Sequence, residues 1–213
     1  MNVFDKLLDF EYKKDTGLVN MTGGFFALFL RKLFLEENRA LLVVTPNIYE
    51  ARKLYNKFDN DVILFEDDEL NLGDGTSISP EMRIDRINIL NDLIKDGKRI
   101  VLTDARGYLR RLPKPSLFSK LNLKFKVGDS FSVSEIIDKL SSFGYNRTSV
   151  VDKTGDFSVR GFVLDIFPVN EDSPVRIEFF GDDIESIRFF DVDSQRSFGQ
   201  KDEVEVLPFT ETA

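Results

Sequence analysis

The sequence predicts an α/β protein in which a parallel sheet has helices on both faces and a small antiparallel α+β domain is inserted. Three observations carry this prediction. Strand and helix patterns alternate in the first half of the chain, a proline-containing break follows at 112–116, and short strand patterns then succeed one another. The expected domains are 1–115 and 116–207, with 208–213 beginning a segment that returns to the first domain.

In the first half, short apolar runs alternate with segments of helical spacing. The expected strands are 18–21, 40–45, 62–65 and 99–103, and the expected helices are 23–35, 48–58 and 80–97. The run Ala40–Thr45 is almost continuously apolar, which predicts a parallel strand buried on both faces. Pro80 follows Ser79 at a first helical position, where proline is favoured. The polar stretch 66–79 is expected to form a loop.

In the second half, one helix precedes a series of strands. Ser132 and Glu135 have the spacing of a capping box, in which each side chain satisfies an amide at the helix start. Gly144 is expected to end that helix. The expected strands are 157–160, 162–167, 175–180 and 184–190, and Gly181–Asp183 is expected to be a hairpin turn.

The composition excludes most catalytic chemistry. The 213 residues contain no cysteine and no histidine. Disulfides, thiolate nucleophiles, Ser-His-Asp triads and the common zinc ligands are therefore excluded. No metal site is expected. The opening residues 1–6 do not resemble a secretory leader, and the apolar runs are too short to span a bilayer, so a cytoplasmic protein is expected.

The negative charge is concentrated in the C-terminal third. Residues 145–213 hold 7 Lys and Arg against 15 Asp and Glu, whereas the first 144 residues hold 22 of each. An acidic surface repels a phosphate backbone, so duplex binding by this segment is not expected. A protein partner with a basic patch is the natural expectation, although the acidity could also serve solubility alone.

A nucleotide-binding loop would lie between the expected strand 18–21 and the helix after it. The motif needs glycine amides, a lysine and a hydroxyl to hold phosphates and magnesium. The corresponding positions are Asn20, Gly23, Phe26 and Ala27. A phenylalanine cannot neutralise a triphosphate, so we expect no cofactor. The alternative is an ordinary helix start, packed by the nearby phenylalanines at 25, 26 and 29.

The strand 175–180 alternates in a way that suggests a binding face. Ile177 and Phe179 should point to the core, and Arg176, Glu178 and Phe180 should point outward. The strand 157–160 repeats the pattern, with Phe157 and Val159 inward and Ser158 and Arg160 outward. Arginines beside an exposed aromatic ring are typical of interaction hot spots. The alternative is that Phe180 packs under the turn and the arginines pair with local acids.

The same segment resembles a known family. The motifs are Gly155–Gly161, Asp165–Pro168, Arg176–Asp182 and Phe190–Ser197, and their order and spacing are similar to those of the repair helicase UvrB and of the bacterial transcription-repair coupling factors (Mfd). The likeness extends upstream through 42–47 and the helix with Arg83 and Arg86. Two features favour the N-terminal UvrB-homology region of the coupling factors over UvrB itself. UvrB keeps a complete phosphate loop, which this chain has lost. UvrB also carries a tyrosine-rich hairpin, whereas 66–79 contains no aromatic residue. The sequence 193–197 also looks like that of the coupling factors.

The resemblance implies a degenerate helicase-like domain lacking a phosphate loop and, at 116–207, a domain that binds UvrA. The family's contact residues fall on Arg160, Arg176 and Phe180, with Glu178 and Arg188 as further candidates. Arg188 could equally pair with Glu178. UvrA docking would recruit excision repair to a stalled RNA polymerase. In a longer protein, RNA polymerase and duplex DNA would be further partners, and ATP-driven DNA translocation would lie outside this chain.

Two other functions remain open at this point. The first is a UvrB-type excision-repair ATPase fragment, and the second is a regulatory face masked by another domain of the same protein. Neither a catalytic residue nor a membrane partner is predicted.

Overall fold

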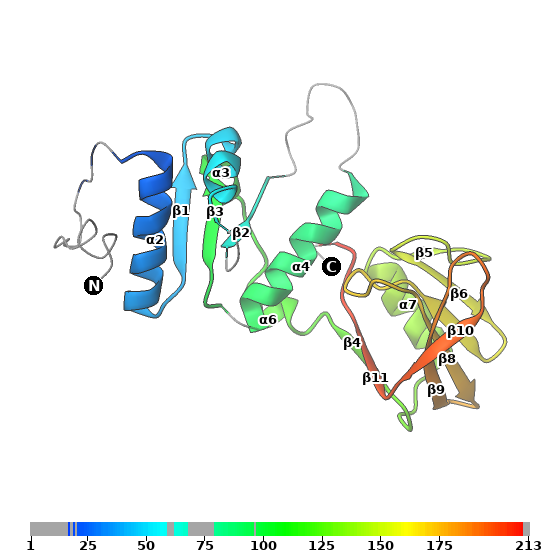
Figure 1. The fold of residues 1–213 in the computed structure, drawn as a ribbon. Helices are drawn as coiled ribbons and strands as arrows, with labels where there is room; N and C mark the ends of the chain where they lie inside the picture. The colour runs from blue at the N-terminus through cyan, green and yellow to red at the C-terminus, as the bar shows by residue number, and fades with distance from the viewer. Residues whose placement is uncertain are drawn as a thin grey trace. The chain divides into compact units, whose positions relative to one another are not determined.

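The computed structural model describes residues 17, 19, 21–58, 62–67, 79–95 and 97–210 (Figure 1). The chain divides into two compact units, one of residues 1–70 and 95–110 and the other of residues 71–94 and 111–213. The helix α4 (Pro80–Lys95) therefore groups mainly with the second unit, although its sequence position had placed it in the first expected domain.

The first unit contains a three-stranded parallel sheet, which confirms the α/β class. Its order is β1-β3-β2, and its strands are β1 (Leu41–Thr45), β2 (Val62–Leu64) and β3 (Ile100–Asp104). Helix α2 (Gly23–Glu37) and helix α3 (Ile48–Tyr55) pack their apolar side chains against it. The buried members of this core are Ala27, Phe29, Leu30, Phe34, Leu54, Ile100 and Leu102.

The predicted burial of strand 40–45 on both faces is wrong at two side chains. Leu42 is 56% exposed and Val44 is 44% exposed. On β1 only alternate residues face the core, because Leu41 and Val43 pack against it and the intervening side chains point away. Two residues of the predicted strand 18–21, Leu18 and Asn20, lie outside the described residues. Val19 and Met21 are not in a strand.

One asparagine and one aspartate side chain cap the N-termini of the two short helices of this unit. The side chain of Asn47 accepts a hydrogen bond from the amide of Glu50 at 3.0 Å, and α3 starts there. Asp104 accepts from the amide of Gly107 at 2.9 Å and begins α5 (Ala105–Leu109), a helix that was not expected from the sequence.

The second unit contains a six-stranded sheet in the order β10-β9-β8-β7-β6-β5, in which only β5 and β6 run parallel (Figure 1). The small antiparallel domain is thus confirmed. Its strands are β5 (Asn146–Arg147), β6 (Asp156–Arg160), β7 (Val163–Ile166), β8 (Val175–Phe180), β9 (Asp183–Phe190) and β10 (Ser197–Lys201). Leu164, Ile177 and Ile187 face one another across three strands and are fully buried.

Besides α4, this unit contains two more helices and a pair of strands outside the six-stranded sheet. They are the short helix α6 (Pro115–Phe118), the helix α7 (Val133–Ser142) and a two-stranded ribbon of β4 (Leu123–Lys126) and β11 (Glu203–Val206). Ile136 and Leu140 are the buried side chains of α7.

The predicted capping box of α7 is wrong, although the helix begins where expected. Ser132 is the N-cap, but its hydroxyl makes no capping bond and lies 2.8 Å from the hydroxyl of Ser134 instead. The neighbouring serine thus competes with the end amides for the same oxygen. The predicted stop is correct, because Gly144 follows the C-cap with φ +85°.

None of the described helices combines the length and apolar character that a bilayer span requires. Within the same described ranges, no three His, Cys, Asp or Glu side chains gather in a group that could hold a metal ion.

Candidate protein-binding face of the antiparallel sheet

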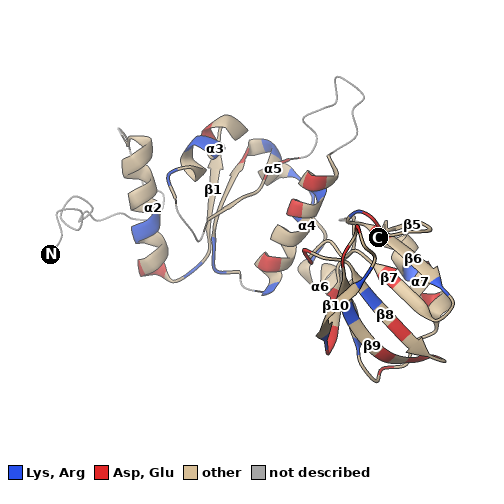
Figure 2. Ribbon diagram, turned by 45° about the vertical axis from the view of Figure 1, so that its right-hand side comes forward, with Lys and Arg blue, Asp and Glu red and all other residues tan. Residues whose placement is uncertain are grey.

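Four strands of the second unit carry a face rich in arginine, which we call the arginine face. The register aligns Ser158, Asp165, Arg176 and Arg188 in one row across β6 to β9, and Arg160, Val163, Glu178 and Ser186 in the next. Directly paired residues point to the same side of a sheet, so these two rows share one face. Figure 2 shows the corresponding basic and acidic bands across β7, β8 and β9.

The predicted alternation of β8 is confirmed on the buried side. Ile177 is fully buried and Phe179 is 5% exposed, whereas Phe180 is 79% exposed. Arg176 and Glu178 lie on the outward side but are only half-buried. The alternative in which Phe180 packs under the hairpin turn is therefore wrong. The turn itself is formed as expected, with Gly181 at φ +65°.

Asp165 connects two of the predicted arginines. Its carboxylate is 1% exposed and accepts hydrogen bonds from Arg176 Nε at 2.7 Å and Arg176 Nη2 at 2.9 Å. Arg160 Nη2 donates to the same carboxylate at 2.8 Å. A bidentate Arg–carboxylate pair is geometrically specific, and burial strengthens it. One buried acid thus orients two arginines of the arginine face.

Arg176 is held on every side. Its Nη1 donates to the carbonyl of Gln195 at 3.2 Å and to the hydroxyl of Ser197 at 3.4 Å. Its guanidinium lies 4.7 Å from the ring centroid of Phe190, a cation–π distance. The hydrogen bonds that Arg176 donates to Asp165 are the main cause that raises the pKa of Arg176 above its ordinary value. The side chain is only 15% exposed, so this arginine chiefly stabilises the sheet.

Arg160 and Arg188 are the more accessible cations. The side chain of Arg160 is 53% exposed and that of Arg188 is 46% exposed. Arg188 Nη2 lies 3.7 Å from a carboxylate oxygen of Glu178, which also accepts from the hydroxyl of Ser186 at 2.5 Å. The arginines therefore do pair with local acids, as the alternative interpretation proposed, yet two of them keep much of their surface in solvent.

Ser158 lies on the predicted side of the sheet, but it is not exposed there as predicted. Ser158 is 2% exposed, and its hydroxyl donates to the carbonyl of Ser149 at 3.2 Å. Gln195, which has φ +56°, donates to the carbonyl of Val151 at 3.2 Å. The segments around these residues cover one end of the arginine face, and the uncovered end is the one that carries Arg160 and Phe180.

The charge of the arginine face differs from that of the surrounding sequence. Within its two rows three arginines outnumber two acids, of which Asp165 is buried, and Asp183, which pairs with Phe180, adds one exposed acid at the uncovered end. Arg160 and Arg188 keep much of their guanidinium surface in solvent, and acidic groups of a partner would complement them. The expectation of a basic partner rested on the total charge of 145–213 and stays a prediction.

The residues at the candidate phosphate loop form an ordinary helix start. Gly23 is the first residue of α2, and the amide of Phe26 donates to the carbonyl of Thr22 at 2.8 Å. Phe25 and Phe26 pack partly buried against the core that contains Ala27 and Phe29. The side chains at the lysine and hydroxyl positions are thus used in packing. Asn20 lies outside the described residues.

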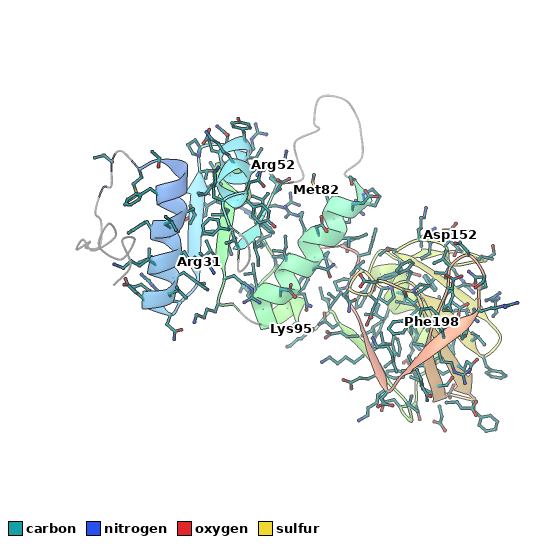
Figure 3. All side chains as sticks on the ribbon, viewed as in Figure 1. Arg31, Arg52, Met82, Lys95, Asp152 and Phe198 are labelled. Carbon is teal, nitrogen blue, oxygen red and sulfur yellow. The ribbon has the colours of Figure 1, made fainter. Side chains whose placement is uncertain are left out.

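Asp156 is a buried carboxylate at the start of β6, next to the edge strand β5. It is 1% exposed and accepts a hydrogen bond from the side-chain Nδ2 of Asn146 at 3.3 Å, while its other carboxylate oxygen is buried without a hydrogen-bond partner among the described residues. Burial is the main cause that raises its pKa, and Asp152, labelled in Figure 3, adds to it. Ionisation of Asp156 therefore opposes folding.

We expect Asp156→Asn to stabilise the chain at pH 7, because the amide cannot ionise and can donate to Asp152. A raised folded-state pKa means that the wild type loses stability as pH rises through that pKa. The gain in unfolding free energy should therefore shrink as pH is lowered towards 4, near the ordinary aspartate pKa. Urea unfolding of both proteins between pH 4 and 7 measures it, and a gain that does not change with pH would contradict the assignment.

Comparison with known proteins agrees with the position of this face. Residues 123–211 match the family model of the UvrB interaction domain. This range contains all of β5 to β10 and therefore the whole arginine face.

The chain as a whole is similar to transcription-repair-coupling factors. It is 30% identical to that of Bacillus subtilis over 203 residues, which cover 93% of this chain and 17% of the relative. It is 31% identical to that of Staphylococcus epidermidis over 214 residues, which cover 96% and 18%, and 32% identical to that of Staphylococcus aureus over 182 residues, which cover 81% and 15%. The chain thus spans less than a fifth of the length of these relatives. The resemblance predicted from residues 155–197 is confirmed: over nearly its whole length the chain is similar to a part of the transcription-repair-coupling factors, and residues 123–211 match the UvrB interaction domain.

Proposed function

We propose that this chain is a non-catalytic docking module whose domain at 116–207 binds UvrA. In the longer protein this contact would recruit excision repair to a stalled RNA polymerase, and the RNA polymerase contact and ATP-driven DNA translocation would belong to other segments. The observation that carries the proposal is the uncovered end of the arginine face. There Arg160 and Phe180 are 53% and 79% exposed within the segment that matches the UvrB interaction domain.

The chemistry of this face suits a protein partner. Arginine and aromatic side chains are enriched among residues that dominate binding energy. Arg160 is oriented by Asp165 before any partner arrives, which lowers the entropy lost on binding. An acidic partner surface would complete the arginine's remaining hydrogen bonds.

We propose that nucleotide binding plays no part in this function and that the chain needs no cofactor. The phosphate-loop lysine position is Phe26, which packs against the core of the first unit, and the hydroxyl position is the buried Ala27. A UvrB-type ATPase would require both groups. Detectable ATP binding by the isolated chain would contradict this part of the proposal.

The test compares UvrA affinities of the wild-type chain and two variants. We expect Arg160→Ala and Phe180→Ala each to weaken binding by about 10-fold or more, because each truncates a side chain at the uncovered end. Lys124→Ala is the matched control, since Lys124 is 77% exposed on the β4–β11 ribbon and should leave the affinity unchanged. Isothermal titration with purified UvrA measures all four. Equal affinities for the wild type and both variants would contradict the proposal.

The alternative function, a regulatory face covered by another domain of a longer protein, is also tested by measuring UvrA binding. If another domain of a longer protein covers the arginine face, UvrA should bind this chain more tightly than it binds the full-length protein. Equal affinities would indicate an open face.

A further inference from the structure

We propose that Phe162 is a second aromatic anchor of this interface, so that the partner presents an apolar recess next to its acidic groups. The inference rests on the proposed docking function and adds a contact residue and a partner chemistry to it. Neither the family resemblance nor the alternation of β8 had indicated this residue.

Backbone pairing brings Phe162 to the same end of the sheet as Phe180. Phe162 lies in the turn that joins Arg160, the last residue of β6, to Val163, the first of β7. Its carbonyl accepts a hydrogen bond from the amide of Phe179 at 2.8 Å. Phe179 precedes Phe180, so the turn and the end of β8 are direct neighbours.

Both rings lie in solvent. Phe162 is 64% exposed and Phe180 is 79% exposed. Phe179, which precedes Phe180 and donates its amide to Phe162, is 5% exposed. Phe198 offers a contrast on the edge strand β10 (labelled in Figure 3), because it is 50% exposed but stacks on Phe189 with ring centroids 5.9 Å apart. Among the described residues, neither Phe162 nor Phe180 has such an aromatic contact. Single exposed apolar residues are common, but two exposed rings whose backbones are neighbours at one end of a sheet indicate a contact surface.

The neighbouring charges define the partner. Arg160 is separated from Phe162 only by Gly161, and it pairs in register with Val163 on the other side of the turn. A partner that accepts both rings must therefore place carboxylates within reach of this guanidinium. The fitting surface is a protein surface with an apolar recess bordered by acidic side chains, which a phosphate backbone does not provide.

The experiment measures the UvrA affinity of the full 213-residue chain at two salt concentrations. We expect Phe162→Ala to weaken binding by about 10-fold, similar to Phe180→Ala, and to do so equally at low and high salt because the contact is apolar. The loss caused by Arg160→Ala should shrink at high salt. Phe198→Ala is the matched control, since it truncates an exposed ring at another edge and should change affinity by less than about 2-fold.

The outcomes separate this inference from the function on which it rests. If Phe180→Ala and Arg160→Ala weaken binding while Phe162→Ala does not, the second anchor is wrong and the docking function stands. If the wild-type chain does not bind UvrA, both are wrong. Phe162→Leu keeps an apolar side chain in the turn and should retain part of the affinity. Circular dichroism spectra identical to the wild type would show that each loss arises from the interface.

Discussion

Replacing Arg176 with alanine is expected to lower the free energy of unfolding of the antiparallel-sheet unit by about 3 kcal/mol, because it leaves a buried carboxylate without its main partner. Arg176 contacts both oxygens of Asp165 at 2.7 and 2.9 Å, and Asp165 is 1% exposed. The substitution also removes the bonds to Gln195 and Ser197. Urea unfolding followed by circular dichroism measures the loss, and amide hydrogen exchange should localise it to β7 and β8.

Arg160→Ala is the matched control for this prediction. Arg160 donates one hydrogen bond to the same carboxylate at 2.8 Å, but its side chain is 53% exposed. Solvent screens such a pair, so its removal should cost less than about 1 kcal/mol. Similar losses for the two variants would contradict the assignment of Arg176 as the structural member of the pair.

A double variant tests the physical reason for the loss. In the Arg176→Ala background, Asp165→Asn should recover part of the stability, because it removes the uncompensated charge. No recovery would mean that packing over Phe190 accounts for the effect instead. An Arg176 variant can bind UvrA more weakly because its sheet is destabilised. A lower affinity of that variant is therefore evidence of a direct contact only if its stability is unchanged.

The sequence predicted the features of this face that depend on local periodicity. Strand side chains alternate with a period of two, so β8 divided correctly into buried Ile177 and Phe179 and outward Arg176, Glu178 and Phe180. The degenerate phosphate loop was equally readable, because each position of that motif has a fixed chemical requirement.

The features that the sequence did not predict depend on contacts between distant segments. Asp165 orients two arginines only because the register places it opposite Arg176, and register is a property of strand pairing. Ser158 is buried because the segment around Ser149 and Val151 covers it. The strand β4 was not predicted either, although a local signal for it existed, because Leu123–Lys126 alternates buried apolar and exposed basic side chains.

A second large effect on stability is expected at Gly155, whose substitution by alanine should cost about 3 kcal/mol, the sum of a backbone contribution and a packing contribution. Gly155 has φ +89°, which alone is unfavourable by about 1–2 kcal/mol for other residues. A Cβ atom would also lie 2.9 Å from the ring of Phe209, so that the ring must move.

The ring of Phe209 is fixed by several neighbours. It lies 6.1 Å from the ring of Tyr145 and has the guanidinium of Arg83 5.5 Å from its centroid. The Tyr145 hydroxyl donates to the carbonyl of Leu207 at 2.8 Å and accepts from the amide of Val169 at 3.3 Å. Displacing Phe209 therefore loosens the segment that follows β11.

Gly128→Ala separates the two causes. Gly128 has φ +92°, almost the same backbone strain, but a Cβ atom there would meet nothing within 4 Å. Its substitution should cost only the backbone term of about 1–2 kcal/mol. Urea unfolding of both variants measures the difference, and the near-ultraviolet dichroism of tyrosine should change only in Gly155→Ala. Because the two glycines share their backbone conformation, equal losses would mean that the contact with Phe209 contributes nothing, whereas a larger loss at Gly155 measures what the packing of Phe209 adds to this unit.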